Sequence, residues 1–95
     1  MTSEPAFNWR DRGRFVELHP VQTGWLLLWG KDEAAGRRKV VVGNRVYPTL
    51  CDARRRLADS VLDLTRQPRL AAQALDLFDH TPFRAHRAAQ LPEPL

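Results

Sequence analysis

The chain has 95 residues and a mass of 10.9 kDa, enough for one small domain and too little for two. Hydrophobic residues make up 43% and charged residues 27%, which excludes a disordered, collagen-like or disulfide-scaffold protein. The single cysteine, Cys51, excludes an internal disulfide and a zinc site built on several cysteines.

The longest uninterrupted apolar run, Trp25–Trp29, is far shorter than the ~20 residues of a membrane span. The first residues lack the basic patch and apolar segment of a signal peptide. We therefore expect a soluble protein of the cytoplasm that has no membrane partner.

Basic residues are in excess. Fifteen Lys and Arg against 11 Asp and Glu give a net charge of +4, which favours attraction to nucleic acid or another anionic surface. All but two of the basic residues are arginine. Arginine binds phosphate through two parallel hydrogen bonds, whereas a GC-rich genome would favour arginine codons without any such role. Both interpretations stay open.

Three β-rich regions occupy the first half of the chain. Arg14–His19 suits a short strand. Trp25–Trp29 is apolar at every position, which is typical of a central strand. Val40–Val42 and Arg45–Tyr47 flank Gly43–Asn44, a pair that tolerates positive φ, so we expect a two-residue hairpin there.

The apolar spacing then changes to three and four residues. Thr49 is a suitable N-cap, with Asp52 as its partner in a capping box. A helix is therefore predicted over Leu50–Leu64. Its apolar residues share one face: Leu50, Ala53, Leu57, Val61 and Leu64. A second helix is expected over Pro68–Phe78, and a third from Thr81 to about Gln90.

Strands followed by helices favour an α+β fold over a parallel βαβ protein. We expect an antiparallel sheet of three or four strands, packed by the Leu50–Leu64 helix, with two shorter C-terminal helices. The single domain would span residues 10–90, between a flexible N-terminal arm at residues 1–9 and a flexible tail at residues 91–95.

Strand alternation decides which side chains share a face of this sheet. One face would be aliphatic and would seat the main helix: Val16, Leu18, Leu26, Leu28, Val41 and Val46. The other would be aromatic and would point away from that helix: Phe15, Trp25, Leu27, Trp29, Val40, Val42, Arg45 and Tyr47. The C-terminal helices, a second copy or another protein could cover the aromatic face. Alternatively, bases could stack on it, each worth ~1–3 kcal/mol, with Arg37, Arg38 and Arg45 holding phosphates.

Arginine clusters offer further contacts. Arg10, Arg12 and Arg14 form either a phosphate-binding arm or an ordinary solvated segment. Arg37–Lys39 could bind phosphate or protect a sheet edge from aggregation. Arg54 flanks the apolar stripe of the main helix without a carboxylate in register, so we expect it to make a contact with a partner.

No set of residues forms a convincing catalytic or metal-binding constellation. The three histidines are scattered, and Asp76, Asp79 and His80 suit an ordinary helix end. Cys51 lies beside Leu50 and is expected to be a small buried residue. We therefore predict a protein that is not an enzyme and has no cofactor or metal.

A series of landmarks runs through the middle of the chain: Gly24-Trp25, a strand, Gly36-Arg37-Arg38-Lys39, a second strand, Tyr47-Pro48-Thr49, and a helix opened by Asp52-Ala53. This layout resembles the three-strand-plus-helix arm-binding domains of tyrosine integrases, and it is similar to small bacterial domains with the same Trp, Thr and Ala landmarks. The resemblance covers Gly24–Leu64 and implies DNA docking through the sheet. The chain departs from it in having strongly aliphatic strands, which offer few polar groups to read base edges.

The sequence thus predicts a small non-catalytic binding module. One hypothesis is nucleic-acid binding through the aromatic and arginine-rich sheet face; the alternative is a protein–protein or homodimer contact through the same apolar face. The candidate binding residues are Trp25, Trp29, Arg37, Arg38, Lys39, Arg45, Tyr47 and Arg54.

Overall fold

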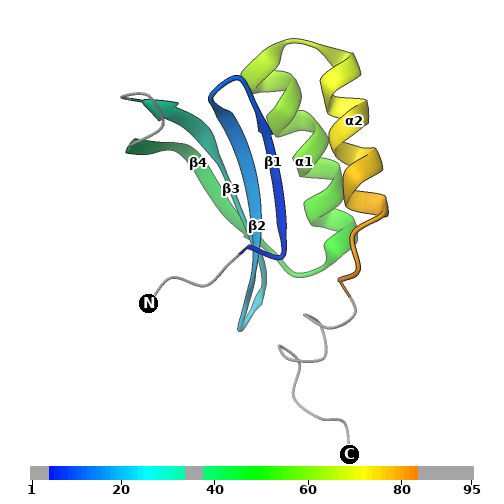
Figure 1. Ribbon diagram of the computed structural model, residues 1–95. Helices are drawn as coiled ribbons and strands as arrows, with labels where there is room; N and C mark the ends of the chain where they lie inside the picture. Colours follow the sequence, from blue (N-terminus) through cyan, green and yellow to red (C-terminus); the bar gives the residue numbers. More distant parts are fainter. Residues whose placement is uncertain (1–4, 34–37, 84–95) are drawn as a thin grey trace, which may run out of the picture.

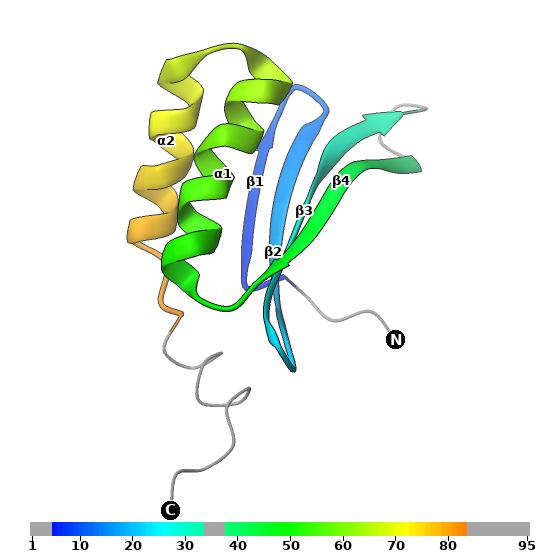
Figure 2. The ribbon, with the colours of Figure 1, turned by 180° about the vertical axis from the view of Figure 1, so that it is seen from behind.

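The computed structural model describes residues 5–33 and 38–83, which form a two-layer α+β fold (Figure 1). Four strands form one antiparallel sheet in chain order: β1 (Phe7–Asp11), β2 (Arg14–Val21), β3 (Gly24–Glu33) and β4 (Arg38–Tyr47). Helices α1 (Leu50–Thr65) and α2 (Pro68–Asp79) follow, and both lie on the same side of the sheet (Figures 1 and 2). The predicted fold class and strands-then-helices order are confirmed.

Strand β1 begins inside the segment that was expected to be a loose arm. Phe7 and Trp9 are each 4% exposed, while the alternating Asn8 and Arg10 are exposed. This alternation lets β1 bury two aromatic rings against the helices. The expectation of a flexible arm is therefore wrong for residues 7–9, and residues 1–4 lie outside the described part of the chain.

The hairpin expected at Gly43–Asn44 is also wrong, because β4 is continuous there. Gly43 pairs with Trp29 and Asn44 pairs with Leu28. The register shifts at the next pair, where Gly30 pairs with Val41 and leaves Val42 as the extra residue of a bulge. A Cβ on Gly43 would fall within the Trp29 indole, so glycine is required here by the close approach of that ring.

The core lies between the sheet and the two helices. Its buried side chains come from all six elements except β4, and Phe83 joins them: Phe7, Trp9, Val16, Leu18, Trp25, Leu27, Ala53, Leu57, Val61, Leu70, Ala71, Ala74, Phe78 and Phe83. Each fully buried Leu or Val contributes ~1.5–3 kcal/mol relative to an exposed one. The aromatic face of β3 is thus the face that the helices cover, the reverse of the predicted arrangement.

The main helix agrees with the sequence prediction. The Asp52 amide donates to Thr49 Oγ1 at 3.1 Å, so Thr49 is the N-cap. Ala53, Leu57 and Val61 are buried in the core, as expected for the apolar stripe.

Helix α2 begins at Pro68 and ends at Asp79, also close to prediction. The third helix expected from Thr81 to about Gln90, and the tail at residues 91–95, fall almost wholly beyond Phe83 and so outside the described residues. Neither α1 nor α2 is both long and apolar enough to cross a membrane.

Candidate functional site

One side of the sheet faces away from both helices (Figure 2); we call it the open face. Four aliphatic side chains of β3 and β4 form a strip on it: Leu26, Leu28, Val41 and Val46. Leu27 lies in the core, so the alternation of β3 directs its two neighbours to the opposite side. Val41 and Val46 are each 43% exposed. No helix of the described chain covers this strip.

A charged cluster occupies the rest of the open face and centres on Glu17 of β2. Lys39 Nζ lies 2.6 Å from Glu17 Oε2, His19 Nε2 lies 3.0 Å from Oε1, and Arg10 approaches Oε2 at 3.5 Å. Arg10 also pairs with Asp32. We call these five residues the Glu17 cluster. It joins all four strands through side chains.

The Glu17 carboxylate is ionised at neutral pH. Burial of its side chain, which is only 5% exposed, would raise the pKa. Hydrogen bonds from Lys39 and His19 and the charges of those two groups together outweigh that effect and hold the pKa below its usual value of 4.5. The carboxylate therefore acts as an anchor for the surrounding cations.

Phe15 lies under this cluster and is fully buried although it belongs to the open face. The Arg10 guanidinium lies 5.4 Å and the Lys39 ammonium 5.2 Å from its ring centroid. The carboxylates of Glu17 and Asp32 are 5% and 17% exposed, whereas Arg10 and Lys39 are each 42% exposed. The cluster therefore presents its positive groups to solvent.

The aromatic residues predicted as a stacking platform lie on the helix side. Trp25 is 4% exposed, and its ring centroid is 5.6 Å from that of Phe83. Tyr47 packs against the core, and Trp29 lies 5.4 Å below the Arg56 guanidinium. The prediction that these rings point away from the main helix is therefore wrong. Large rings bury more area under the helices than the aliphatic side would.

The predicted basic contacts are dispersed. Arg37 lies outside the described residues, Arg38 is exposed at the start of β4, and Lys39 belongs to the Glu17 cluster. Arg45 lies on the helix side, 5.9 Å from the Tyr47 ring centroid.

Arg54 has a carboxylate partner that its own helix did not reveal. Its Nε and Nη2 each lie 2.7 Å from Asp79 of α2. These hydrogen bonds raise the pKa of Arg54 and lower the pKa of Asp79. The spacing along α1 gave no sign of this partner, because it comes from the second helix.

Cys51 is exposed, contrary to the expectation of burial. Among the described residues no group of three or more His, Cys, Asp or Glu side chains gathers to hold a metal ion. Sequence reasoning missed the Glu17 cluster. The available signal was the spacing of Phe15, Glu17 and His19, which places all three on one face of a strand.

No family model, curated protein or solved structure matches this chain. The likeness to integrase arm-binding domains is therefore one of landmarks within Gly24–Leu64. Within that range the structure has two strands, β3 and β4, and helix α1, rather than three strands and a helix.

Proposed function

We propose that this chain is a non-catalytic binding module whose open face docks an acidic, aliphatic segment of another protein. The observation that supports the proposal best is the aliphatic strip, in which Val41 and Val46 are exposed and Leu26 and Leu28 are half-buried. Apolar patches rimmed by polar groups are typical of protein interfaces.

The charge around the strip favours an acidic partner. Arg10 and Lys39 are the exposed members of the Glu17 cluster, while its carboxylates face inward. Strand β4 carries Arg38, Lys39 and Arg45 and no carboxylate. Opposite charge across an interface speeds association and excludes partners of the wrong sign.

The same charges disfavour a second copy as the occupant. β4 is an edge strand, and pairing two copies of it would bring its three cations close to the three cations of the partner. The bulge at Val42 interrupts the regular edge that such pairing would use. An acidic segment that lies on the open face avoids the repulsion between cations and does not need a regular strand edge.

The test uses the full chain and a synthetic peptide in which glutamate and leucine alternate. Methyl NMR spectra should show peptide-dependent shifts at Leu26, Leu28, Val41 and Val46, and a lysine–leucine peptide should leave these signals unchanged. Val46→Glu places a carboxylate in the strip and should abolish the shifts. Leu77→Glu is the matched control because Leu77 is 52% exposed on α2, away from the sheet.

Sedimentation of the free protein tests whether a second copy of the chain covers the open face instead. We expect a monomer. A dimer that Val46→Glu dissociates and Leu77→Glu preserves would show that a second copy covers the face, and would overturn the acidic-partner proposal. Equal binding of both peptides, or shifts confined to the helices, would also overturn it.

A further inference from the structure

Two arginines adopt a backbone conformation that arginine seldom takes. Arg12 in the β1–β2 turn has φ 47°, and Arg66 at the C-cap of α1 has φ 57°. They are the only non-glycine residues with positive φ in the described chain. Glycine and asparagine adopt this region at lower cost, and both are common in such turns and caps. Arginine at both positions points to a role for the side chains.

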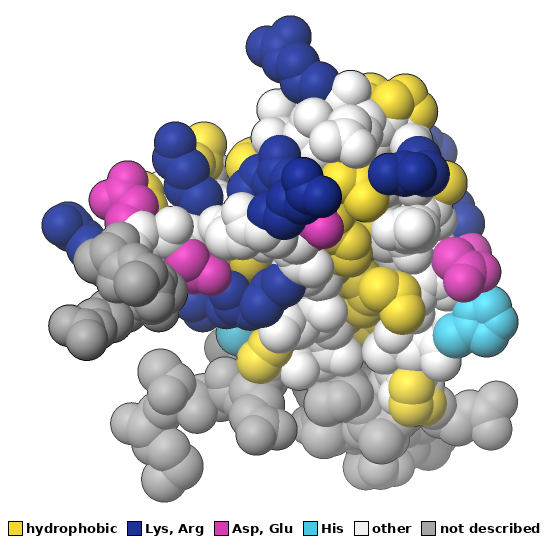
Figure 3. All heavy atoms as spheres, turned by 45° about the horizontal axis from the view of Figure 1, so that its top comes forward, with side chains coloured by type: hydrophobic (Ala, Val, Ile, Leu, Met, Phe, Trp, Pro, Cys, Tyr) yellow, Lys and Arg dark blue, Asp and Glu magenta, His cyan; other side chains and the backbone are white. Residues whose placement is uncertain are grey.

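Both arginines lie at the same end of the molecule, where the β1–β2 turn meets the α1–α2 connection. Arg14 Nη1 lies 3.5 Å from the Leu64 carbonyl and links the two regions. Lys31 pairs with Arg14 in the sheet, and Arg69 is in the first turn of α2. We call Arg12, Lys31, Arg66 and Arg69 the basic end. Figure 3 brings this end forward and shows several Lys and Arg side chains spread over it, with an acidic side chain beside the central group.

The charges of the basic end are not neutralised within the described chain. The side chains of Arg12, Lys31, Arg66 and Arg69 form no ion pair or hydrogen bond with another described residue. Carboxylates do lie nearby: Asp32 and Glu33 follow Lys31 in β3, Asp32 pairs with Arg10, and Asp11 is held by Arg14 at 2.9 Å. Asp63 comes within 3.9 Å of Arg56. Four free cations therefore face solvent together.

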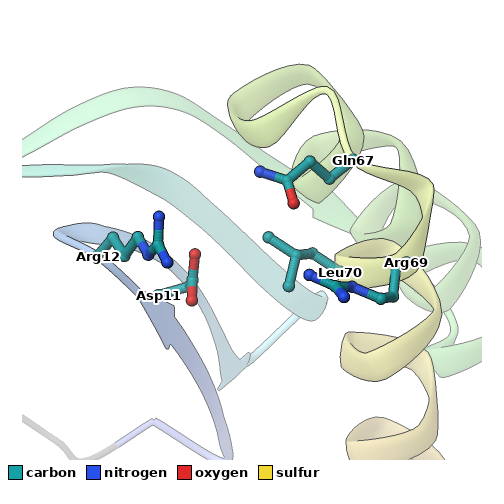
Figure 4. A pocket seen from close by; sticks show the side chains of 5 residues that line it. All are labelled: Asp11, Arg12, Gln67, Arg69 and Leu70. Atoms are coloured by element: carbon teal, nitrogen blue, oxygen red, sulfur yellow. The ribbon is translucent and has the colours of Figure 1, made fainter.

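A small pocket lies between the two parts of this end (Figure 4). Asp11 at the end of β1 and Arg12 of the β1–β2 turn line one side, and Gln67 of the α1–α2 connection with Arg69 and Leu70 of α2 lines the other. Its volume is about 70 Å³, roughly that of two water molecules at ~30 Å³ each. A pocket of this size suits a small group such as a single phosphate.

We propose that the basic end binds the phosphate backbone of double-stranded nucleic acid. Arg12 and Arg69 would hold one phosphate at the pocket, and Arg66 and Lys31 would contact neighbouring phosphates. Four cations without an ion-pair partner among the described residues are more than one phosphate ion requires, so we expect several phosphates of one molecule to bind. This surface is separate from the open face, so it does not depend on the function proposed above.

The buried aromatic rings favour a duplex over the other phosphate-bearing macromolecules. Single-strand binding proteins stack bases on exposed aromatic side chains, and membrane-surface proteins anchor through Trp and Tyr. Here Trp9 and Trp25 are in the core and Tyr47 packs against it. A contact through guanidinium and ammonium groups, without aromatic stacking, suits a duplex backbone read without sequence preference.

The test variant is Arg12→Asn/Arg66→Asn. It removes two cations and places at both positions a residue that adopts positive φ at lower cost. Arg12→Asn creates Asn-Gly, the preferred pair of a type I′ turn, and asparagine also suits the left-handed cap at residue 66. We expect the melting temperature to stay the same or rise. Duplex DNA affinity at low salt should fall on the order of tenfold. The slope of log Kd against log salt should fall by about 1.8, or about 0.9 per arginine.

Arg55→Gln is the control for the removal of an exposed arginine elsewhere on the surface. Arg55 is an exposed arginine of α1 about 16 Å along the helix from Arg66, and it should leave the slope unchanged. Three results would overturn the proposal: no DNA binding by the parent chain, a parent-like slope in the double variant, or an equal loss with Arg55→Gln.

Further arms of the same experiment identify the source of the phosphate. Binding to inorganic phosphate or to anionic phospholipid vesicles in place of the duplex would overturn the nucleic-acid assignment. Equal affinity for polyglutamate would show that the surface does not select phosphate.

Discussion

Lys39 of β4 reaches across β3 to Glu17 of β2, and its Nζ lies 2.6 Å from Oε2 of that carboxylate. The contact ties strands that are not neighbours in the sheet. It also holds the Lys39 ammonium above the fully buried Phe15 ring. The arrangement of the charged side chains on the open face therefore depends on the ionised Glu17.

Glu17→Gln should lower the free energy of unfolding by about 1–2 kcal/mol at neutral pH, because it weakens charge-assisted hydrogen bonds to partners that are partly exposed. The pKa of Glu17 is lower in the folded chain than its usual 4.5. Its stabilisation is therefore fully present above pH 4.5 and is lost as the pH falls through the folded-state pKa. Urea unfolding across this range should show parent and variant converging in acid.

Glu33→Gln controls for the removal of a carboxylate, because Glu33 is exposed at the end of β3. If the gap between parent and Glu17→Gln does not narrow in acid, the carboxylate is not the source of the stabilisation.

Gly43→Ala should cost about 1–3 kcal/mol, because the added methyl group would fall within the Trp29 indole and force that ring to move. Aromatic rings that cover a strand glycine in this way help to fix register. Denaturant unfolding measures the loss. Asn44→Ala, at the exposed neighbouring position, should change stability by less than about 0.5 kcal/mol. Equal stability of the two variants would contradict the Trp29–Gly43 contact.

Ser60→Ala should stabilise the chain by about 1 kcal/mol, because the buried Ser60 hydroxyl has no hydrogen-bond partner among the described residues. Ser60 is fully buried in α1, where alanine also has the higher helix propensity. The midpoint of urea unfolding gives the result. A loss of stability would show that the hydroxyl is bonded in the folded protein.

Cys51 should react with iodoacetamide in the native chain, since the residue is exposed in the first turn of α1. We expect the native rate to lie within about threefold of the rate in urea, as for an accessible thiol. Mass spectrometry of the adduct follows the reaction. A thiol that reacts only after unfolding would place Cys51 in the core, as the sequence had suggested.

Local signals were sufficient to predict α1. The Thr49 cap and the stripe of Ala53, Leu57 and Val61 depend on residues no more than four apart, so the sequence contains all that decides them. β1 could have been found in the same way, from the alternation of Phe7 and Trp9 with polar residues.

Gly43 misled the prediction because glycine has more than one use in a strand. A hairpin needs it for positive φ, whereas here it makes room for a ring from β3, a neighbour that the local sequence does not identify. The Arg54–Asp79 pair was missed for the same reason, because its two residues are 25 positions apart in the sequence.

Alternation placed Trp25 and Tyr47 together correctly, as register partners on one face. Alternation could not say which face the helices cover. That choice depends on the volume of the side chains on each face, whereas alternation gives only which residues share a face. Small Ala53 in the stripe of α1 leaves space for large rings, and the aromatic side became the core.

Solvent relaxation of methyl NMR signals by a soluble gadolinium chelate tests most directly which face of the sheet is open. We expect strong broadening at Val41 and Val46 and little at Leu18 and Leu27, which are fully buried. Broadening of Leu18 and Leu27 with protection of the two valines would contradict the account, because it would place the helices on the aliphatic side.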